Sequence, residues 1–292
     1  MQDFPDNGII SFSGSIPGPS IVVIGGTHGN ERTGIAVVRA LRDDIVAGRR
    51  SVVSGTLTLM LGNPEAIAQN IRAIDGRDLN RYFSPSMLAN GDGSTEFQRA
   101  RMIASIVQSS DVVIDIHATN KPSVPFAIAR NDAAHRNIFR WFNPPCVLTD
   151  PTYIFGGGVP VTIDEYADSI EKVGLCFETG WVNDESIIPA VTESVVRYLT
   201  DVRIFSGEKI APPSIEGKIY EIVAAILRDD RSFAFAEGRG MSSFEPIASG
   251  DILGYHDDEP VVTEHDGVIM FPKLPEHQAV GKPVCYLAKC TG

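Results

Sequence analysis

Two side chains that can bind a metal ion, His28 and Glu31, lie three residues apart in the stretch VVIGGTHGNERTG, residues 22–34. The stretch ends an apolar run, and its glycines let the backbone turn tightly enough to aim both side chains at one point. A second apolar run, DVVIDI, ends at His117. The three residues would form a His₂Glu set, which is typical of catalytic zinc with an open water position. A helix-capping glutamate beside a lone polar histidine is the alternative for the first pair.

A carboxylate, Glu178, follows a third apolar run, GLCF. In open α/β sheets, ligands bind beyond the carboxyl ends of the strands, so we expect Glu178 to lie near the two histidines. Asp115 precedes His117 by two residues and would share its face of a strand, where it could orient the histidine or be an unrelated buried acid. The HxxE spacing alone is weak evidence for a metal site, because His256 and Glu259 have the same spacing in HDDE, a charged turn of the C-terminal region.

Three arginines, Arg72, Arg77 and Arg81, lie with Asn80 in the segment NIRAIDGRDLNRYF, residues 70–83. The arginine guanidinium binds carboxylates through two hydrogen bonds, and close to a metal ion it can stabilise a developing oxyanion. The alternative is a set of surface ion pairs with the aspartates of the same segment.

Strand-like and helix-like segments alternate between residues 20 and 200, which predicts an α/β fold with a mixed sheet flanked by helices. The predicted strands are SIVVIGG, TLTLMLGN, DVVIDIH, PFAIAR, CVLTD and GLCFETG, and the main predicted helices are ERTGIAVVRALRDDIVAG, EFQRARMIASIVQS, AHRNIFRWF, VTIDEYADSIEKV and IPAVTESVVRYLTDV. Helix signals vanish after the Pro-containing junction APPS. We therefore expect a catalytic domain over residues 1–205 and a smaller β-rich domain over residues 206–292.

The composition of the 292 residues excludes several classes of partner. A net charge of −12 argues against nucleic acid and anionic membrane as partners. No apolar run is long enough to span a bilayer, and the segment MQDFPDNGII lacks the features of a signal peptide. The four cysteines are scattered without a CxxC pair, which favours reduced thiols and predicts a cytoplasmic protein.

Four motifs, GGTHGNE, DLNR, DIHAT and ETG, occur in this order. Together they resemble those of the succinylglutamate desuccinylase/aspartoacylase family of zinc-dependent deacylases, whose fold is related to the zinc carboxypeptidases. The similarity runs from about residue 22 to residue 181. The family also carries a smaller β-rich C-terminal domain. The resemblance implies one zinc ion per chain, bound by His28, Glu31 and His117.

The resemblance also implies roles for the polar residues around that zinc ion. Glu178 matches the glutamate that takes a proton from zinc-bound water and passes it to the leaving amine. Arg72, displaced by one residue because IDGRDLNR carries an extra residue, matches the arginine that polarises the scissile carbonyl. Asn80 and Arg81 match the pair that holds a substrate carboxylate.

The sequence departs from the aspartoacylase-like members at two positions. Where those members have an arginine that grips the substrate carboxylate, this chain has Asp168. An acid in the site would favour a cationic or neutral amino-acid portion, although Asp168 could also be a residue of the helix surface. Those members also contribute a tyrosine from the C-terminal domain. The corresponding segment FPKLPEHQAV has none, and His277 is the nearest candidate.

The sequence therefore predicts a zinc-dependent amidohydrolase that cleaves the amide bond of an N-acyl amino acid or a similar small N-acyl amine. The alternatives are a metallocarboxypeptidase acting on short peptides and a non-catalytic zinc- or ligand-binding protein of the same fold. The expected partner is the small N-acylated substrate, with no nucleic acid and no membrane. The sequence leaves a homo-oligomer open.

Overall fold

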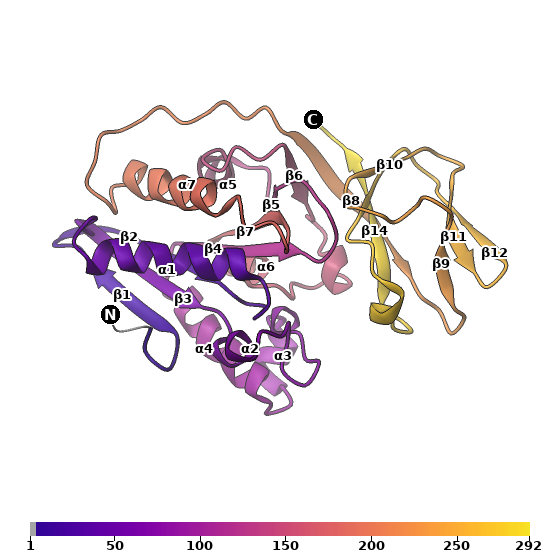
Figure 1. Cartoon of the computed structure of the whole chain (residues 1–292), viewed down its shortest axis with the longest axis horizontal. Coiled ribbons are helices and arrows are strands. Elements are labelled where there is room, and N and C mark those ends of the chain that lie inside the picture. Colours follow the sequence, from indigo (N-terminus) through magenta and orange to yellow (C-terminus); the bar gives the residue numbers. More distant parts are fainter. Residues whose placement is uncertain (1–3) are drawn as a thin grey trace.

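A mixed sheet of eleven strands runs through residues 4–292, which are the residues that the computed structural model describes (Figure 1). From one edge to the other the strands are β1 (Ile9–Ser13), β3 (Ser54–Leu61), β2 (Ile16–Gly25), β4 (Val112–Thr119), β7 (Val173–Trp181), β5 (Phe126–Ile128), β6 (Cys146–Thr149), β8 (Lys218–Leu227), β14 (Pro283–Cys290), β13 (Gly267–Met270) and β10 (Glu245–Ile247). Strands β3, β2, β4 and β7 are parallel, whereas β1 and the strands beyond β8 pair antiparallel. The predicted mixed α/β sheet is confirmed.

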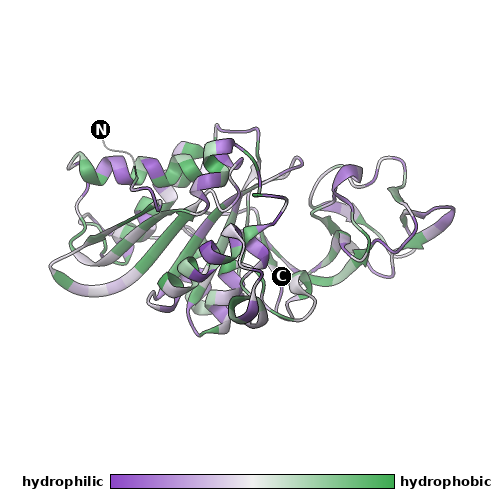
Figure 2. Ribbon diagram, turned by 90° about the horizontal axis from the view of Figure 1, so that it is seen from below, coloured by the Kyte–Doolittle hydropathy of each residue, from purple (hydrophilic) through white to green (hydrophobic). Residues whose placement is uncertain are grey.

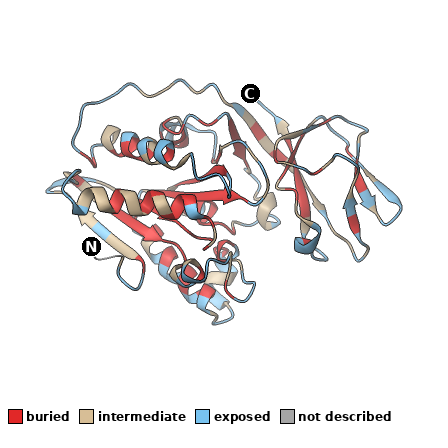
Figure 3. Cartoon of the chain, in the orientation of Figure 1, coloured by how far each residue is buried: buried red, intermediate tan, exposed pale blue. Residues whose placement is uncertain are grey.

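Helices cover both faces of the parallel strands, which explains why those strands read as continuous apolar runs. On one face, α1 (Arg32–Val46), α5 (Ala133–Phe139) and α7 (Ile188–Asp201) share an apolar core with Ile21 and Val23 of β2. On the other face, α4 (Thr95–Gln108) and α6 (Ile163–Ser169) share a core with Val22 and Ile24. Figure 3 shows the strands buried between these two layers. Alternate residues of one strand therefore serve two separate apolar cores.

The turn that follows β2 is tight, because two of its glycines lie directly against the backbone of neighbouring segments, with no room for a side chain. A Cβ atom on Gly25 would lie 2.1 Å from the carbonyl oxygen of Gly34 in α1, and one on Gly29 would lie 2.1 Å from the backbone carbonyl carbon of Ala66. Ala66 belongs to the short helix α2 (Pro64–Gln69). The glycines of this segment thus bring strand β2, helix α1 and helix α2 together at one point.

The C-terminal part is β-rich, as the sequence predicts. Strands β8, β14, β13 and β10 extend the main sheet, and a second sheet contains β9 (Phe233–Phe235), β11 (Ile252–His256) and β12 (Glu259–Val262). Figure 2 shows this part projecting from the helix-covered part. Because β6 pairs directly with β8, the main sheet continues across the predicted boundary at residue 205. The division into two domains stays a prediction.

Four short elements connect the larger ones: η1 (Leu79–Arg81), α3 (Pro85–Asn90), η2 (Ile154–Gly156) and η3 (Pro275–His277). Helix α3 and the edge strand β1 were not among the predicted elements. Of the helices in residues 4–292, none has both the length and the apolar character needed to cross a membrane. The four cysteines are free thiols, three of them buried.

Candidate metal centre and active site

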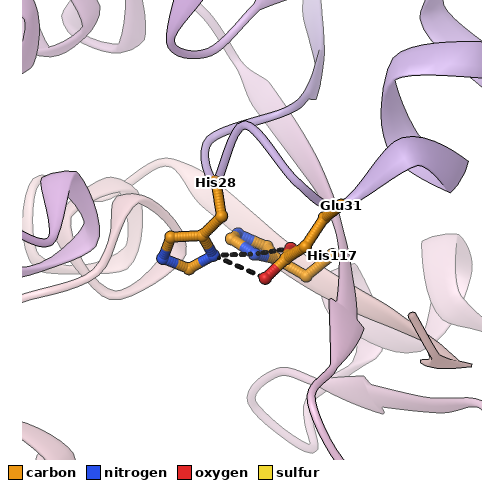
Figure 4. A group of neighbouring side chains, drawn as sticks. All are labelled: His28, Glu31 and His117. Atoms are coloured by element: carbon orange, nitrogen blue, oxygen red, sulfur yellow. Dashed lines mark hydrogen bonds and ion pairs between the residues drawn. The ribbon is translucent and has the colours of Figure 1, made fainter. Parts of the chain in front are cut away.

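His28 and Glu31 lie in the loop between β2 and α1, and His117 lies in β4 (Figure 4). The Nδ1 atom of His28 is 2.7 Å from Oε1 of Glu31, and the Nδ1 atom of His117 is 2.9 Å from Oε2 of the same carboxylate. The two Nδ1 atoms are 3.2 Å apart. All three side chains are almost completely buried, and one donor atom of each lies within 4.8 Å of the others. The structure therefore brings the three predicted ligands into direct contact.

The Glu31 carboxylate does not cap helix α1, so the helix-capping alternative is excluded. Besides the two histidines, it accepts hydrogen bonds from the backbone N–H of Ala118 at 3.1 Å and from Nη1 of Arg72 at 2.9 Å. A carboxylate with this many donors is fixed in orientation, which suits a metal ligand.

Each histidine directs its other ring nitrogen at an aspartate. Nε2 of His117 is 2.8 Å from Oδ2 of Asp115, and Nε2 of His28 is 2.8 Å from Oδ1 of Asp78. The Thr27 hydroxyl donates to Asp115 at 2.9 Å and holds that carboxylate in turn. Such contacts fix the orientation of ligand histidines and raise their basicity. The sequence analysis named Asp115 as a candidate for this role, whereas Asp78 entered only as a possible surface ion-pair partner of the arginines.

The donor set fits a divalent metal ion such as zinc. Burial lowers the pKa of His117, but the charges of Asp115 and Glu31 outweigh this and raise the pKa well above its usual value. Burial raises the pKa of Glu31, but His28 and His117 outweigh it and hold that pKa well below its usual range. Both shifts favour a protonated His117 beside an ionised Glu31, and a metal ion bound here would displace such a proton.

Glu178 lies beside this cluster on β7, in register with His117 of the neighbouring strand. Its side chain is buried, and its Oε2 atom has no hydrogen-bond partner. Burial raises the pKa of Glu178 to about 7, against the charge of His117, which lowers it. An unpaired carboxylate with a pKa near neutrality is suited to take up and return a proton.

Arg72 reaches the same cluster from the segment before η1. Its Nη1 atom donates to Glu31, and its Nη2 atom lies 3.4 Å from Oδ2 of Asp78. The side chain is 37% exposed, so part of the guanidinium stays accessible. Arg77 instead pairs with Asp92 on the surface. Of the two, Arg72 is the arginine that can act at the metal centre.

Asn80 and Arg81 form the end of η1, which the Asp78 side chain caps by accepting a hydrogen bond from the Asn80 N–H. Asn80 is buried, and its Oδ1 accepts a hydrogen bond from the backbone N–H of Ile163 at 3.0 Å. Arg81 is exposed, and its Nη1 atom donates a hydrogen bond to the carbonyl oxygen of its neighbour Asn80 at 2.7 Å. The pair can thus offer an amide and a guanidinium to an anion.

A cavity of about 1170 Å³ opens over the metal centre, and Glu178, Arg72, Asn80 and Arg81 all line it. The loop at Gly156–Gly158 forms part of its wall. The C-terminal part supplies the rest, including His277, which is exposed at η3. The predicted metal, proton-transfer and arginine residues, together with His277, therefore meet in one cavity.

Sequence reasoning missed most of the residues that the C-terminal part adds to the cavity wall. Tyr286 on β14 contributes to the cavity wall, as does Lys273 in the loop after β13. Burial and the neighbouring charges of Arg81 and Arg72 lower the pKa of Lys273. The apolar character of PVCYLAKC is typical of a strand, but nothing in the sequence indicates which face of that strand lies against the catalytic part.

Asp168 does not line this cavity, and its predicted role in substrate binding is therefore corrected. Its Oδ1 atom is 2.9 Å from Nε2 of His135 and accepts a hydrogen bond from the N–H of Gly174, and its Oδ2 atom is 3.2 Å from Nε of Arg130. His135 is buried and also contacts Asp132 at 2.8 Å. The Asp168 carboxylate thus connects α6 with α5 through its contact with His135.

The sequence model of the succinylglutamate desuccinylase/aspartoacylase catalytic domain matches residues 17–188. The chain belongs to this family. It is 35% identical over 175 residues to an N-acyl-aromatic-L-amino acid amidohydrolase (carboxylate-forming) of Xenopus laevis, covering 57% of this chain and 56% of the relative. It is 38% identical over 106 residues to a protein of Parasynechococcus marenigrum named "Probable aspartoacylase", covering 34% of this chain and 33% of the relative. The chain thus spans about half or less of the length of these curated relatives.

Solved structures of this family share the fold. A succinylglutamate desuccinylase from Vibrio parahaemolyticus superposes with a TM-score of 0.82 at 17% identity, over 100% of this chain and 90% of the other. The two folds therefore correspond over both the helix-covered part and the β-rich C-terminal part.

Proposed function

We propose that this protein is a zinc-dependent amidohydrolase that removes the acyl group from an N-acyl amino acid or a similar small N-acyl amine. The convergence of His28, Glu31 and His117 on one point, with the unpaired Glu178 carboxylate beside them, carries this proposal. Membership of a family of deacylases and the names of the curated relatives support it.

His28, Glu31 and His117 would hold the metal ion. Zinc bound there would lower the pKa of a water molecule and polarise the scissile carbonyl. Glu178 would accept the proton of the attacking water on its free Oε2 atom and donate it to the leaving amine. The guanidinium of Arg72 would stabilise the negative charge that develops on the carbonyl oxygen.

Asn80 and Arg81 would hold a carboxylate of the substrate. Arg81 lines the cavity, and a guanidinium binds a carboxylate through two parallel hydrogen bonds. The walls that the C-terminal part adds on the far side favour small substrates. The free cysteine thiols are consistent with the predicted cytoplasmic location, which stays a prediction.

The test is amine release by the zinc-loaded protein from a panel of N-acyl amino acids. Acetyl and succinyl groups are each combined with acidic, neutral and basic side chains, and short unblocked peptides form a separate arm. Release from the N-acyl amino acids supports the proposal. Cleavage of the peptides alone would favour a carboxypeptidase, and the absence of any turnover at full zinc occupancy would favour a binding protein.

A further inference from the structure

A second acid, Asp164, lies in the wall of the catalytic cavity. It belongs to the first turn of α6, whose backbone packs directly on β7: a Cβ atom on Gly174 would lie 2.2 Å from the carbonyl oxygen of Asp164. Gly174, Cys176 and Glu178 share one face of β7, and Cys176 lines the cavity beside Asp164. Two residues of a strand span about 7 Å. Asp164 therefore lies deeper along β7 than Glu178, on the same side of the sheet.

Asp164 differs from the neighbouring acids Glu31, Asp115 and Asp168, each of which pairs with a histidine. Its side chain is buried, yet none of the ion pairs formed within residues 4–292 involves it. The charges that act on it most strongly are those of Glu165, Asp168 and Asp115, all negative. Burial and the charge of Glu165 raise the pKa of Asp164 to about 8. Near pH 7 the site without a ligand therefore holds a largely neutral carboxyl group, and a cation bound beside it would favour the ionised form.

The opposite charge lies on another part of the same cavity. Arg81 and Lys273 line it, and their mutual repulsion contributes to the lowered pKa of Lys273. Asn80 connects the two regions, because its Oδ1 accepts the backbone N–H of Ile163, the residue before Asp164. A carboxylate held by Asn80 and Arg81 and a cation held by Asp164 can therefore belong to one small molecule.

We propose that Asp164 makes the enzyme selective for N-acyl amino acids whose side chain carries a cation, such as an ammonium group on three or four methylenes. This inference rests on the proposed amidohydrolase function. The α-carboxylate of such a substrate is held at Asn80 and Arg81 while the scissile amide faces Glu178. The side chain extends along β7 past Cys176, and its cation pairs with Asp164, where the low dielectric strengthens the attraction. Asp164 thus takes the role that the sequence assigned to Asp168.

The test compares kcat/KM for three substrates of similar length: Nα-acetyl-L-lysine, Nα-acetyl-L-norleucine and Nα-acetyl-L-glutamate. We expect the wild-type enzyme to prefer the lysine substrate over norleucine by about tenfold or more. Asp164→Asn, which keeps the shape and removes the charge, should abolish most of that preference. The control Asp201→Asn changes an acid on α7, which packs on the opposite face of the sheet, and should retain it.

A binding measurement on the wild-type protein makes the test independent of any variant. Calorimetry with the zinc-loaded protein should give L-lysine, a product, a Kd about tenfold or more below that of L-norleucine. The proposal is overturned if norleucine or glutamate is the preferred side chain, or if Asp164→Asn lowers kcat/KM equally for all three substrates. In those cases the hydrolysis itself still upholds the amidohydrolase function. If no substrate is hydrolysed, that function fails, and equal binding of the two free amino acids overturns the role of Asp164 separately.

Discussion

Replacement of Glu178 by glutamine is the most direct test of the chemistry. The amide has the same shape as the carboxylate but cannot take up a proton from water. General acid–base catalysis by a positioned side chain contributes about 10²- to 10⁴-fold. Because Oε2 of Glu178 is buried and unpaired, it is free to accept the proton, and we expect its loss to lower kcat by about 10³-fold within that range. KM should change little, because the carboxylate-holding residues are untouched.

The assay is amine release from an N-acetyl amino acid, with the zinc content of each preparation measured in parallel. Zinc content should be unchanged, because the three ligands are intact. The matched control is Glu193→Gln, an exposed glutamate of α7 that pairs with Arg197 on the surface. A Glu178→Gln enzyme with full zinc occupancy that keeps kcat within about tenfold of the wild type would refute the assignment of the base.

The dependence of kcat/KM on pH is a second test of the role of Glu178. Glu178 must be ionised to accept a proton, so kcat/KM should rise with pH through its pKa. That pKa is about 7 in the metal-free protein, and the positive charge of a bound metal ion would lower it, so the acid limb should lie below pH 7. The limb should be missing from the residual activity of Glu178→Gln.

The fold and the metal centre yield further predictions. Chelation should abolish hydrolysis, and addition of zinc should restore it and raise Tm. The affinity for zinc should fall at acid pH, because protons compete for the histidine nitrogens. Calorimetric titration with zinc at several pH values measures that affinity. Gly29→Ala should lower both Tm and zinc content, because its Cβ would overlap the backbone of Ala66, whereas Gly157→Ala, which meets no atom within 4 Å, should keep its zinc. Asp168→Asn should lower the free energy of unfolding by about 1–3 kcal/mol by weakening the buried contact with His135. Burial lowers the pKa of His135, but Asp168 and Asp132 outweigh it and raise that pKa, so this stabilisation is complete below about pH 6.5 and declines as the pH rises through the raised value. Urea titrations of both proteins at pH 6 and pH 9 should show the larger difference at pH 6.

The ligand set could be predicted from the sequence because each member follows an apolar run that had to become a buried strand. The carboxyl ends of parallel strands meet at one edge, so the order of the chain already brings His28, His117 and Glu178 together. The contact between His28 and Asp78 could not be predicted, since it joins two irregular segments whose path depends on packing.

The difference between Asp164 and Asp168 shows a finer limit. The two residues lie on the same short helix, four positions and thus about 6 Å apart along its axis. Both are acids at helical spacing, so the sequence alone gives them equal standing. The packing of α6 in the folded protein decides between them, because Asp164 lines the cavity and Asp168 does not. The same applies to Tyr286, whose position depends on where β14 joins the sheet.

The order of strands at the C-terminal end of the sheet sets the sequence of events during synthesis. Strand β14 lies between β8 and β13, yet it leaves the ribosome after both. Until it emerges, β8 has β6 as its sheet neighbour on one side and an open edge on the other, and β13 cannot join the sheet. A nascent chain can therefore assemble the cluster of His28, Glu31 and His117 well before it closes the cavity around them. Early capture of a metal ion by such an open intermediate would tie maturation of the enzyme to the metal supply at the site of translation.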